Sequence, residues 1–318
     1  MRLPAFAGVP SGLGFPQTRI RSAPHIRALV LRAGAGLLLT SMLSGLLSAY
    51  VGWQLTHPGR KALSGAPSMP YRDVTFPSSD SLQLSGWFLD AASNRTVILV
   101  HGYRENRLQE NVPGLDVAEG LVGNGYNVLM FDLRDSGSSA GSLTTIGVFE
   151  QRDVLGAIAY VHSLGRPAEH VALLGFSMGA ATALLTAGHG GDAQAVISDS
   201  AFADLYPYLQ DNLTVWSHLP TFPFTPLILG LEPAITGADP RLADPIHWVG
   251  KISAPILFIH GLADGSIPYR NSEELARAAT NPASELWLVP GADHVKSFET
   301  DRQGYWQHLL PFLDRALS

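Results

Sequence analysis

The sequence contains no cysteine, which excludes a disulfide-stapled scaffold, a thiolate nucleophile and any cysteine-based metal site. It does not identify the compartment, because a disulfide-free protein can reside anywhere. Low-complexity sequence is also lacking, since the 32 glycines and 22 prolines are spread along the chain. Apolar residues make up 46% of the 318 residues, enough for a sizeable core in a single α/β domain.

Acidic residues are absent from residues 1–72, which carry eight basic ones. The remainder of the chain holds 13 basic and 27 acidic residues, a net charge of −14. An acidic body of this kind argues against nucleic acid as a partner. The basic head needs another explanation, and the segment that follows it supplies one.

Residues 33–55 carry no charge and are rich in Leu, Ala and Gly. A helix of about 20 such residues spans the hydrocarbon core of a bilayer. Tyr50 and Trp53 stand near the end of the segment, where amphipathic rings favour the membrane interface. We therefore expect a basic tail over 1–32 and a transmembrane helix over 33–55.

Five arginines precede this span, whereas only Arg60 and Lys61 follow it closely. The positive-inside rule then predicts a single-pass anchor with a cytoplasmic N-terminus and the body on the outer, periplasmic or extracellular side. One alternative is a secreted protein whose signal peptide has its apolar region at 37–47, with Ser48 and Ala49 as a weak cleavage site. Another is a buried core helix, although the segment lacks a polar face.

The segment 56–70 is rich in Pro, Gly and Ser and is typical of a linker, so the folded body should cover 71–318. Short apolar runs alternate there with segments of helical periodicity, which predicts a mostly parallel central sheet with helices on both faces. We expect strands at 71–77, 82–89, 96–100, 127–131, 171–174, 195–198, 255–259 and 285–289, and helices at 115–123, 148–164, 177–187, 271–279 and 305–316.

The alternation lapses at about 203–250, a stretch with many prolines and aromatic residues. Ligands of open α/β sheets bind beyond the carboxyl ends of the strands, where such an insertion would lie. We expect a cap that provides an apolar wall for an acyl chain or ring; the alternative is a helical excursion that only packs on the sheet. Together with its leading edge, the stretch holds the aromatic residues Phe202, Tyr206, Tyr208, Trp216, Phe222, Phe224 and Trp248.

A Gly-x-Ser-x-Gly pentapeptide occupies residues 175–179, between an expected buried strand and an expected helix. In that context the pattern indicates a nucleophile elbow, a strained turn that raises the hydroxyl of Ser177 above the sheet. The helix N-terminus adds oriented N–H groups and the positive end of a dipole. Ser177 is therefore the predicted nucleophile.

A serine nucleophile needs a base, and the base needs an orienting carboxylate. In the order serine, acid, histidine, the best combination downstream is Asp264 and His294. Each follows an expected strand and lies on a loop at the same sheet edge as Ser177. Asp199, which follows the strand at 195–198, is the rival acid. His260 is expected to be structural.

Two backbone N–H groups should stabilise the tetrahedral oxyanion. One belongs to Met178, directly after the nucleophile. The other should come from the loop at 101–106, where Tyr103 offers its N–H. His101 is expected to brace this loop rather than to act as a base.

With these features the chain resembles the α/β-hydrolase superfamily over residues 71–318, and more narrowly the membrane-anchored bacterial hydrolases related to dienelactone hydrolase. Many relatives carry Arg-Gly-His-Gly after the fourth strand, where this chain has Arg134-Asp135-Ser136-Gly137; this departure affects that loop and not the triad. The resemblance rests on His57-Pro58, Val74-Thr75-Phe76-Pro77, Leu84-Ser85-Gly86-Trp87-Phe88, His101-Gly102-Tyr103, Gly175-Phe176-Ser177-Met178-Gly179, Asp199-Ser200-Ala201-Phe202, Asp264 and His294.

The predicted function is that of a membrane-tethered carboxylesterase acting on acyl esters, thioesters or lipid-like substrates through an acyl-enzyme. This chemistry needs no metal and no organic cofactor. Two alternatives stay open. The same triad serves peptidases, amidases and acyltransferases, and a non-catalytic binding protein can retain the fold.

Overall fold

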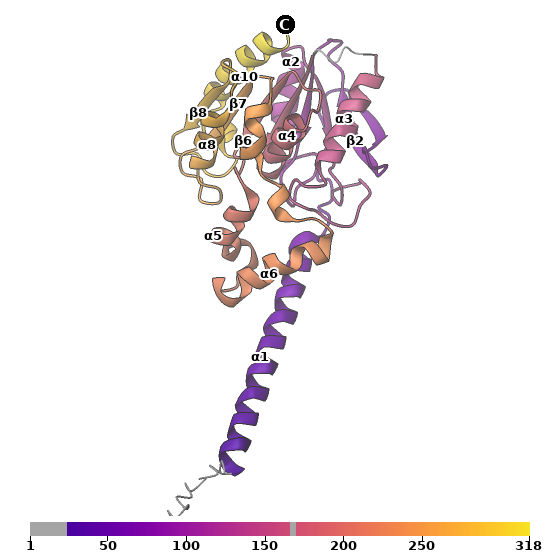
Figure 1. The fold of residues 1–318 in the computed structure, drawn as a ribbon. Coiled ribbons are helices and arrows are strands. Elements are labelled where there is room, and N and C mark those ends of the chain that lie inside the picture. The colour runs from indigo at the N-terminus through magenta and orange to yellow at the C-terminus, as the bar shows by residue number, and fades with distance from the viewer. Residues whose placement is uncertain (1–23, 166–169) are drawn as a thin grey trace, which may run out of the picture. The chain divides into compact units, whose positions relative to one another are not determined.

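The computed structural model describes residues 24–165 and 170–318. Its body is built on one eight-stranded sheet in the order β1-β2-β4-β3-β5-β6-β7-β8 (Figure 1). β2 runs antiparallel to β1 and β4, and the remaining pairs are parallel. The strands are β1 (Arg72–Pro77), β2 (Gln83–Leu89), β3 (Thr96–Val100), β4 (Asn127–Phe131), β5 (Val171–Phe176), β6 (Ala195–Asp199), β7 (Ile256–Gly261) and β8 (Glu285–Val289).

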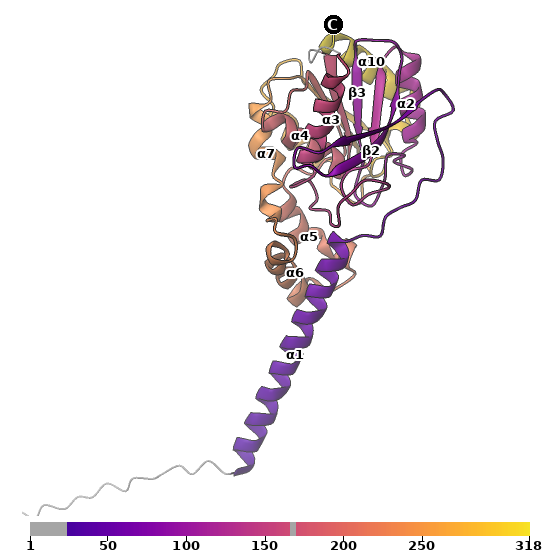
Figure 2. The same cartoon turned by 90° about the vertical axis from the view of Figure 1, so that its right-hand side faces the viewer.

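Helices cover both faces of the sheet, which explains why every residue of the central strands β3 to β7 is buried. On one face pack α3 (Gln151–Ser163), α4 (Met178–Gly188) and α8 (Arg270–Ala278). On the other pack α2 (Gly114–Gly123), the short α9 (Ser297–Thr300) and α10 (Arg302–Ala316) (Figure 2). The fold is therefore the three-layered α/β-hydrolase architecture that the alternating pattern predicts.

The insertion between β6 and β7 consists mainly of two helices, α5 (Leu205–Ser217) and α6 (Thr221–Thr236). Asp204 caps α5 by accepting a hydrogen bond from the backbone N–H of Tyr206. Residues of α5 and α6 form a small apolar core of their own. The chain then returns to the sheet through η2 (Pro240–Leu242), α7 (Pro245–Trp248) and η3 (Val249–Lys251).

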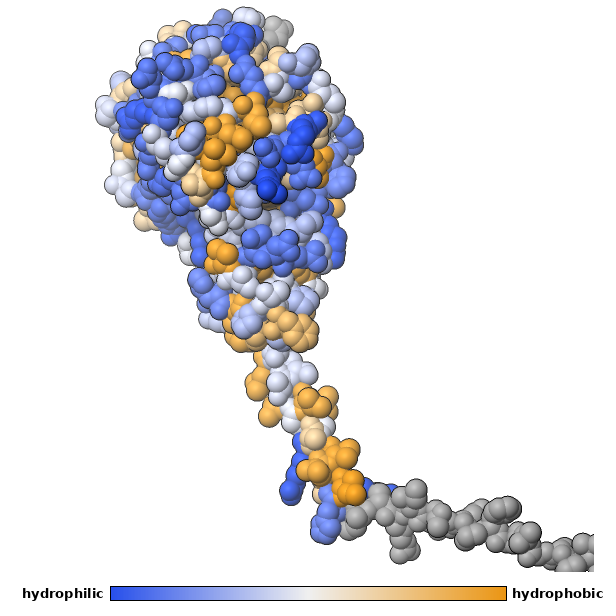
Figure 3. Space-filling model, turned by 90° about the vertical axis from the view of Figure 1, so that its left-hand side faces the viewer, coloured by the Kyte–Doolittle hydropathy of each residue, from blue (hydrophilic) through white to orange (hydrophobic). Residues whose placement is uncertain are grey.

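The N-terminal helix α1 (Pro24–Thr56) contains the expected span 33–55 and begins further toward the N-terminus; the rest of the expected tail, residues 1–23, lies outside the described residues. From His25 to Thr56 it is long and apolar enough to cross a membrane, as an anchor or a signal sequence near the N-terminus would be. Large exposed apolar side chains gather along it (Figure 3).

The chain separates into two compact units within α1, one ending at Ser44 and one beginning at Gly45. The last turns of α1 thus belong to the same unit as the sheet. There Ser48 and Gly52 are buried, and Val51 and Leu55 pack against the small core of α5 and α6.

The segment expected to be a linker is held against the body. The Lys61 ammonium lies 2.8 Å from a carboxylate oxygen of Glu105 and 2.8 Å from one of Glu110. The side-chain amide of Asn106 donates to the carbonyl groups of Lys61 and Ala62. These contacts attach the segment to the loop that follows β3.

Candidate active site

The turn between β5 and α4 places Ser177 above the sheet. Its φ of +54° and ψ of −118° lie in a region that non-glycine residues rarely adopt, so the turn is strained. The N–H of Ser177 donates to the carbonyl of Asp199 over 2.8 Å, which holds the turn in place. A Cβ on Gly175 would collide with the carbonyl of Gly179, so the strand and the helix can approach only through glycine.

The structure brings the three predicted triad residues together. The Nε2 atom of His294 lies 2.9 Å from the Oγ of Ser177, and its Nδ1 atom lies 2.7 Å from Oδ2 of Asp264. Asp264 follows β7 and His294 follows β8, so all three side chains meet at the carboxyl edge of the parallel strands. This is the arrangement in which a histidine can accept a serine proton while a carboxylate holds the ring.

The carboxylate of Asp264 is fully buried and accepts hydrogen bonds at both oxygens. Its Oδ1 accepts the backbone N–H groups of Ser266 and Ile267, each over 2.8 Å. Burial raises the pKa of Asp264, but the N–H donors of His260 and His294 lower it by more, so the pKa lies well below its ordinary value. The group therefore stays ionised over the whole neutral range.

His260 is a second donor to this acid, a role that the sequence analysis did not foresee. Its Nε2 lies 2.9 Å from the carbonyl oxygen of Ile267 and 3.1 Å from Oδ2 of Asp264, so this nitrogen must carry the proton. Its Nδ1 then accepts from the hydroxyl of Ser272 over 2.7 Å. The position of His260 could have indicated this role, because it stands near the end of β7, four residues before Asp264.

The rival acid Asp199 does not contact the histidine. Its Oδ1 accepts from the hydroxyl of Ser200 over 2.9 Å, and its Oδ2 has no hydrogen-bond partner among the described residues. Burial raises its pKa to about 7, although the Ser200 hydrogen bond opposes the rise. The Ser200 oxygen accepts the N–H of Val295, so Asp199 supports the loop that carries His294 from behind.

The loop after β3 is braced by two buried side chains. His101 lies 2.8 Å from the carbonyl of Gly102 through Nδ1, and its Nε2 accepts the N–H of Leu133 over 2.9 Å. The N–H of Gly102 donates to the side chain of Gln109. Within the described part of the chain, the N–H groups of Tyr103 and Met178 make no hydrogen bond to another protein group. Both are free to bind an oxyanion.

The comparisons with known proteins agree with this geometry. The family model of X-Pro dipeptidyl-peptidase (S15 family) matches residues 69–225. The Pyrococcus furiosus esterase Pf2001 superposes with a TM-score of 0.70 at 26% identity, over 83% of this chain and 99% of that one. The chain is a serine hydrolase of the α/β-hydrolase superfamily.

Two curated relatives, each named as an uncharacterised protein, match most of the hydrolase. YqkD of Bacillus subtilis is 28% identical over 262 residues, which cover 81% of this chain and 84% of the relative. YfhR of Escherichia coli K12 is 29% identical over 257 residues, covering 77% and 81%. A Pyrococcus horikoshii acylaminoacyl peptidase shares the fold at 18% identity and a TM-score of 0.58, over 78% of this chain and 41% of that one. Esterases and peptidases thus both occur among its structural neighbours.

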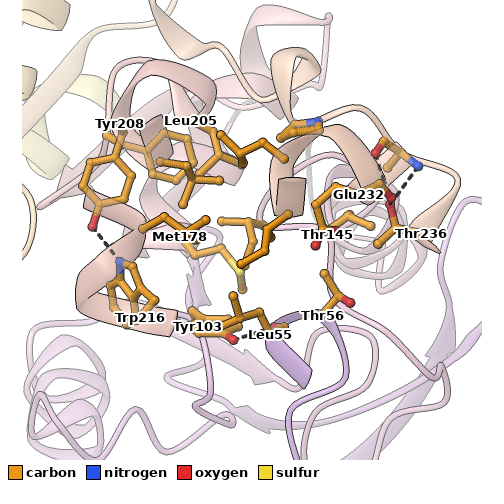
Figure 4. A pocket seen from close by; sticks show the side chains of 18 of the residues that line it. Leu55, Thr56, Tyr103, Thr145, Met178, Leu205, Tyr208, Trp216, Glu232 and Thr236 are labelled. Carbon is orange, nitrogen blue, oxygen red and sulfur yellow. Dashed lines mark hydrogen bonds between the residues drawn. The ribbon is translucent and has the colours of Figure 1, made fainter. Parts of the chain in front are cut away.

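A pocket of about 840 Å³, including its mouth, adjoins Ser177 in the hydrolase (Figure 4). One wall is the sheet edge with Tyr103, Thr145 and Met178. The hydroxyl of Tyr208 accepts from the Trp216 indole N–H over 2.9 Å. The opposite wall comes from the inserted helices and is almost entirely apolar: Leu205, Tyr208, Leu209, Leu213 and Trp216 from α5, and Ile228, Leu229, Glu232 and Thr236 from α6.

The end of α1 forms a further part of the pocket wall, which the sequence analysis did not anticipate. Leu55 and Thr56 both line the pocket. The hydroxyl of Tyr103 donates to the carbonyl of Leu55 over 2.5 Å, and the N–H of Thr144 donates to that of Thr56 over 2.8 Å. The helix that was expected only to tether the hydrolase is therefore hydrogen-bonded to the loop that carries a predicted oxyanion donor.

Proposed function

We propose that this hydrolase cleaves carboxylic esters, thioesters or lipid-like esters whose acyl group enters the pocket beside Ser177. The observation that carries the proposal is the pocket itself, because its lining by α5, α6 and the end of α1 is almost wholly apolar and it reaches the nucleophile. Burial of an apolar chain there contributes about 0.8 kcal/mol per methylene. Sugars and phosphates would find few polar partners.

In the proposed mechanism, the Oγ of Ser177 attacks the ester carbonyl while Nε2 of His294 takes its proton. Asp264 stabilises the imidazolium through Nδ1. The N–H groups of Tyr103 and Met178 hold the oxyanion of the tetrahedral intermediate. His294 returns the proton to the leaving alcohol, and a water molecule then releases the acid from Ser177 by the same route in reverse.

For the setting of this reaction, we propose that α1 anchors the hydrolase in a membrane, with a cytoplasmic N-terminus and the catalytic body on the outer side. Cleavage of a signal peptide after Ala49 is the competing outcome. Because Leu55 and Thr56 follow that cleavage site, they would remain in the wall of the pocket. The N-terminal sequence of the mature protein, purified from membranes, distinguishes the two.

The test of the reaction uses the full-length protein in detergent. Fluorophosphonate labelling and turnover of p-nitrophenyl esters of graded chain length are measured for wild type and Ser177→Ala. Ser163→Ala, an exposed serine on α3, is the matched control. We expect both signals to be lost in Ser177→Ala alone.

Amide substrates decide between an esterase and a peptidase. Because the S15 family model matches residues 69–225, dipeptidyl X-Pro anilides and acyl anilides are tested beside the esters. Faster turnover of an anilide than of its ester would replace the esterase proposal with a peptidase. A folded wild-type protein that neither labels nor turns over any substrate would favour a non-catalytic binding protein.

A further inference from the structure

The apolar pocket contains one acid, Glu232 on α6. The residue is 8% exposed and lines the same pocket as Ser177 (Figure 4). Among the described residues, its carboxyl group has no hydrogen-bond or salt-bridge partner. Of the described residues that line the pocket, it alone is of Asp, Glu, Lys, Arg or His type. No feature of the proposed ester chemistry uses this group.

The carboxyl group faces the last turns of α1. A Cβ placed on Gly52 would lie 2.8 Å from Oε1 of Glu232 and 3.4 to 3.5 Å from Ile235 and Ile228. The bare backbone of α1 at Gly52 therefore covers one side of the carboxyl group, and the side chains of Ile228 and Ile235 approach the same glycine. Neither supplies a charge to the carboxyl group. Because Glu232 also lines the pocket, a charged partner would reach it from there.

An uncompensated carboxylate in such a place is costly. Burial alone raises the pKa of Glu232 to about 7, with no donor or cation to oppose it. An apolar side chain of similar size would avoid this cost. A cation in the pocket would remove it as well, because it would pair with the ionised form, whereas an anionic ligand would be repelled.

We propose that Glu232 is a recognition site for a cationic group of the substrate, an ammonium carried at a distance from the scissile ester. The inference rests on the proposed function, since it concerns the group that enters the acyl pocket. The carboxylate and the ammonium would form a desolvated pair, and the apolar wall between Ser177 and Glu232 would bind the intervening methylene chain. The hydrolase would then select cationic acyl esters over equally long neutral ones.

The test compares isosteric p-nitrophenyl esters that differ only in charge. The pair 6-(trimethylammonio)hexanoate and 7,7-dimethyloctanoate has the same shape, with a permanent charge in the first member only. Homologues with shorter and longer methylene chains test which chain length spans the distance from Ser177 to Glu232. The pair 8-aminooctanoate and nonanoate tests whether Glu232 binds only an ammonium group that can donate N–H hydrogen bonds.

The readout is the ratio of kcat/KM for the cationic to the neutral ester, which cancels general effects of a substitution on folding or turnover. For full-length wild type in detergent at pH 8 we expect a ratio of about 10 or more at the best chain length, expressed mainly in KM. The ratio should fall as the pH drops through about 7, where Glu232 takes up its proton. In Glu232→Gln it should collapse by about tenfold. In Asp211→Asn, which alters an exposed acid on α5 outside the pocket, it should match wild type.

Turnover of the neutral esters without any cationic preference, in both substrate pairs, would overturn this inference and leave the proposed function standing. A preference that survives in Glu232→Gln would also overturn it, because another group would then bind the cation. Loss of all ester turnover in wild type would overturn the inference together with the proposed function.

Discussion

Replacement of Asp264 by asparagine tests the chemistry of the triad with little change of shape. The carboxylate accepts at both oxygens, from Ser266 and Ile267 at Oδ1 and from His260 and His294 at Oδ2. An asparagine has one oxygen and one NH₂ group. The NH₂ group must therefore point either at the two backbone N–H donors or at the two histidines. The backbone N–H groups cannot adapt.

His294 can adapt, because a neutral imidazole carries its proton on either nitrogen. We therefore expect the NH₂ group of Asp264→Asn to turn toward the histidines and to donate to Nδ1 of His294. The proton of His294 then lies on Nε2, facing the Oγ of Ser177 at 2.9 Å, and the ring cannot accept the serine proton. The same loss of tautomer in a serine protease triad lowers kcat about 10⁴-fold, or about 5 kcal/mol.

The assay is kcat on the best p-nitrophenyl ester, together with the rate of fluorophosphonate labelling and the melting temperature as a check on folding. Asp199→Asn is the matched control. Asp199 does not touch His294, and an asparagine there keeps the acceptor for Ser200, so we expect a loss of less than about tenfold. A folded Asp264→Asn protein that keeps more than about a tenth of wild-type kcat would refute this account of the orienting acid.

Three further predictions concern the pocket and the helix that closes it. Because burial raises the native pKa of Glu232 to about 7, the native state holds a proton that the unfolded state releases at lower pH, so the free energy of unfolding should fall by up to about 3 kcal/mol between pH 4.5 and 7. Thermal unfolding against pH should show a shallower slope in Glu232→Gln than in wild type; part of the slope should remain, because burial also raises the pKa of Asp199 to about 7. Gly52→Ala should cost less than about 1 kcal/mol relative to Gly45→Ala, because its Cβ meets only the movable end of the Glu232 side chain at 2.8 Å, whereas a Cβ on Gly45 meets nothing within 4 Å; a loss of several kcal/mol in the melting curve of Gly52→Ala would contradict this. Deletion of residues 1–56 removes a pocket wall and should lower kcat/KM for long acyl esters more than for acetate, as a chain-length profile would show.

The parallel core could be predicted closely because buried strands have a simple sequence signature. β3, β4 and β8 begin and end at the residues expected from their short apolar runs. The pentapeptide around Ser177 indicated the elbow, since it combines a strand end, a helix start and glycines where the backbones touch. Asp264 and His294 followed from chain order and strand ends, which parallel topology brings to one edge.

The inserted helices were beyond local prediction for an identifiable reason. α6 contains Pro226 and Pro233 in its interior, and proline disfavours a helix there. Its helical form depends on packing with α5 and with the end of α1, contacts that no local pattern contains. The aromatic density of the stretch still indicated a cap, because large apolar rings need a partner surface.

The role of α1 shows the limit of hydropathy most clearly. An apolar run that lies in lipid and one that packs on protein have the same composition, so residues 45–55 were assigned wholly to the expected membrane span. Two signals in the sequence bear on the difference once the structure is known. Gly52 permits close approach of another helix, and Glu232 is the one charged residue in the otherwise apolar α6. A buried acid without a partner is costly, and Glu232 lines the pocket beside the last turns of α1. The last turns of α1, the inserted helices and the pocket therefore lie in one compact unit from Gly45 onward, and we expect a change in any of them to alter which substrates the hydrolase accepts.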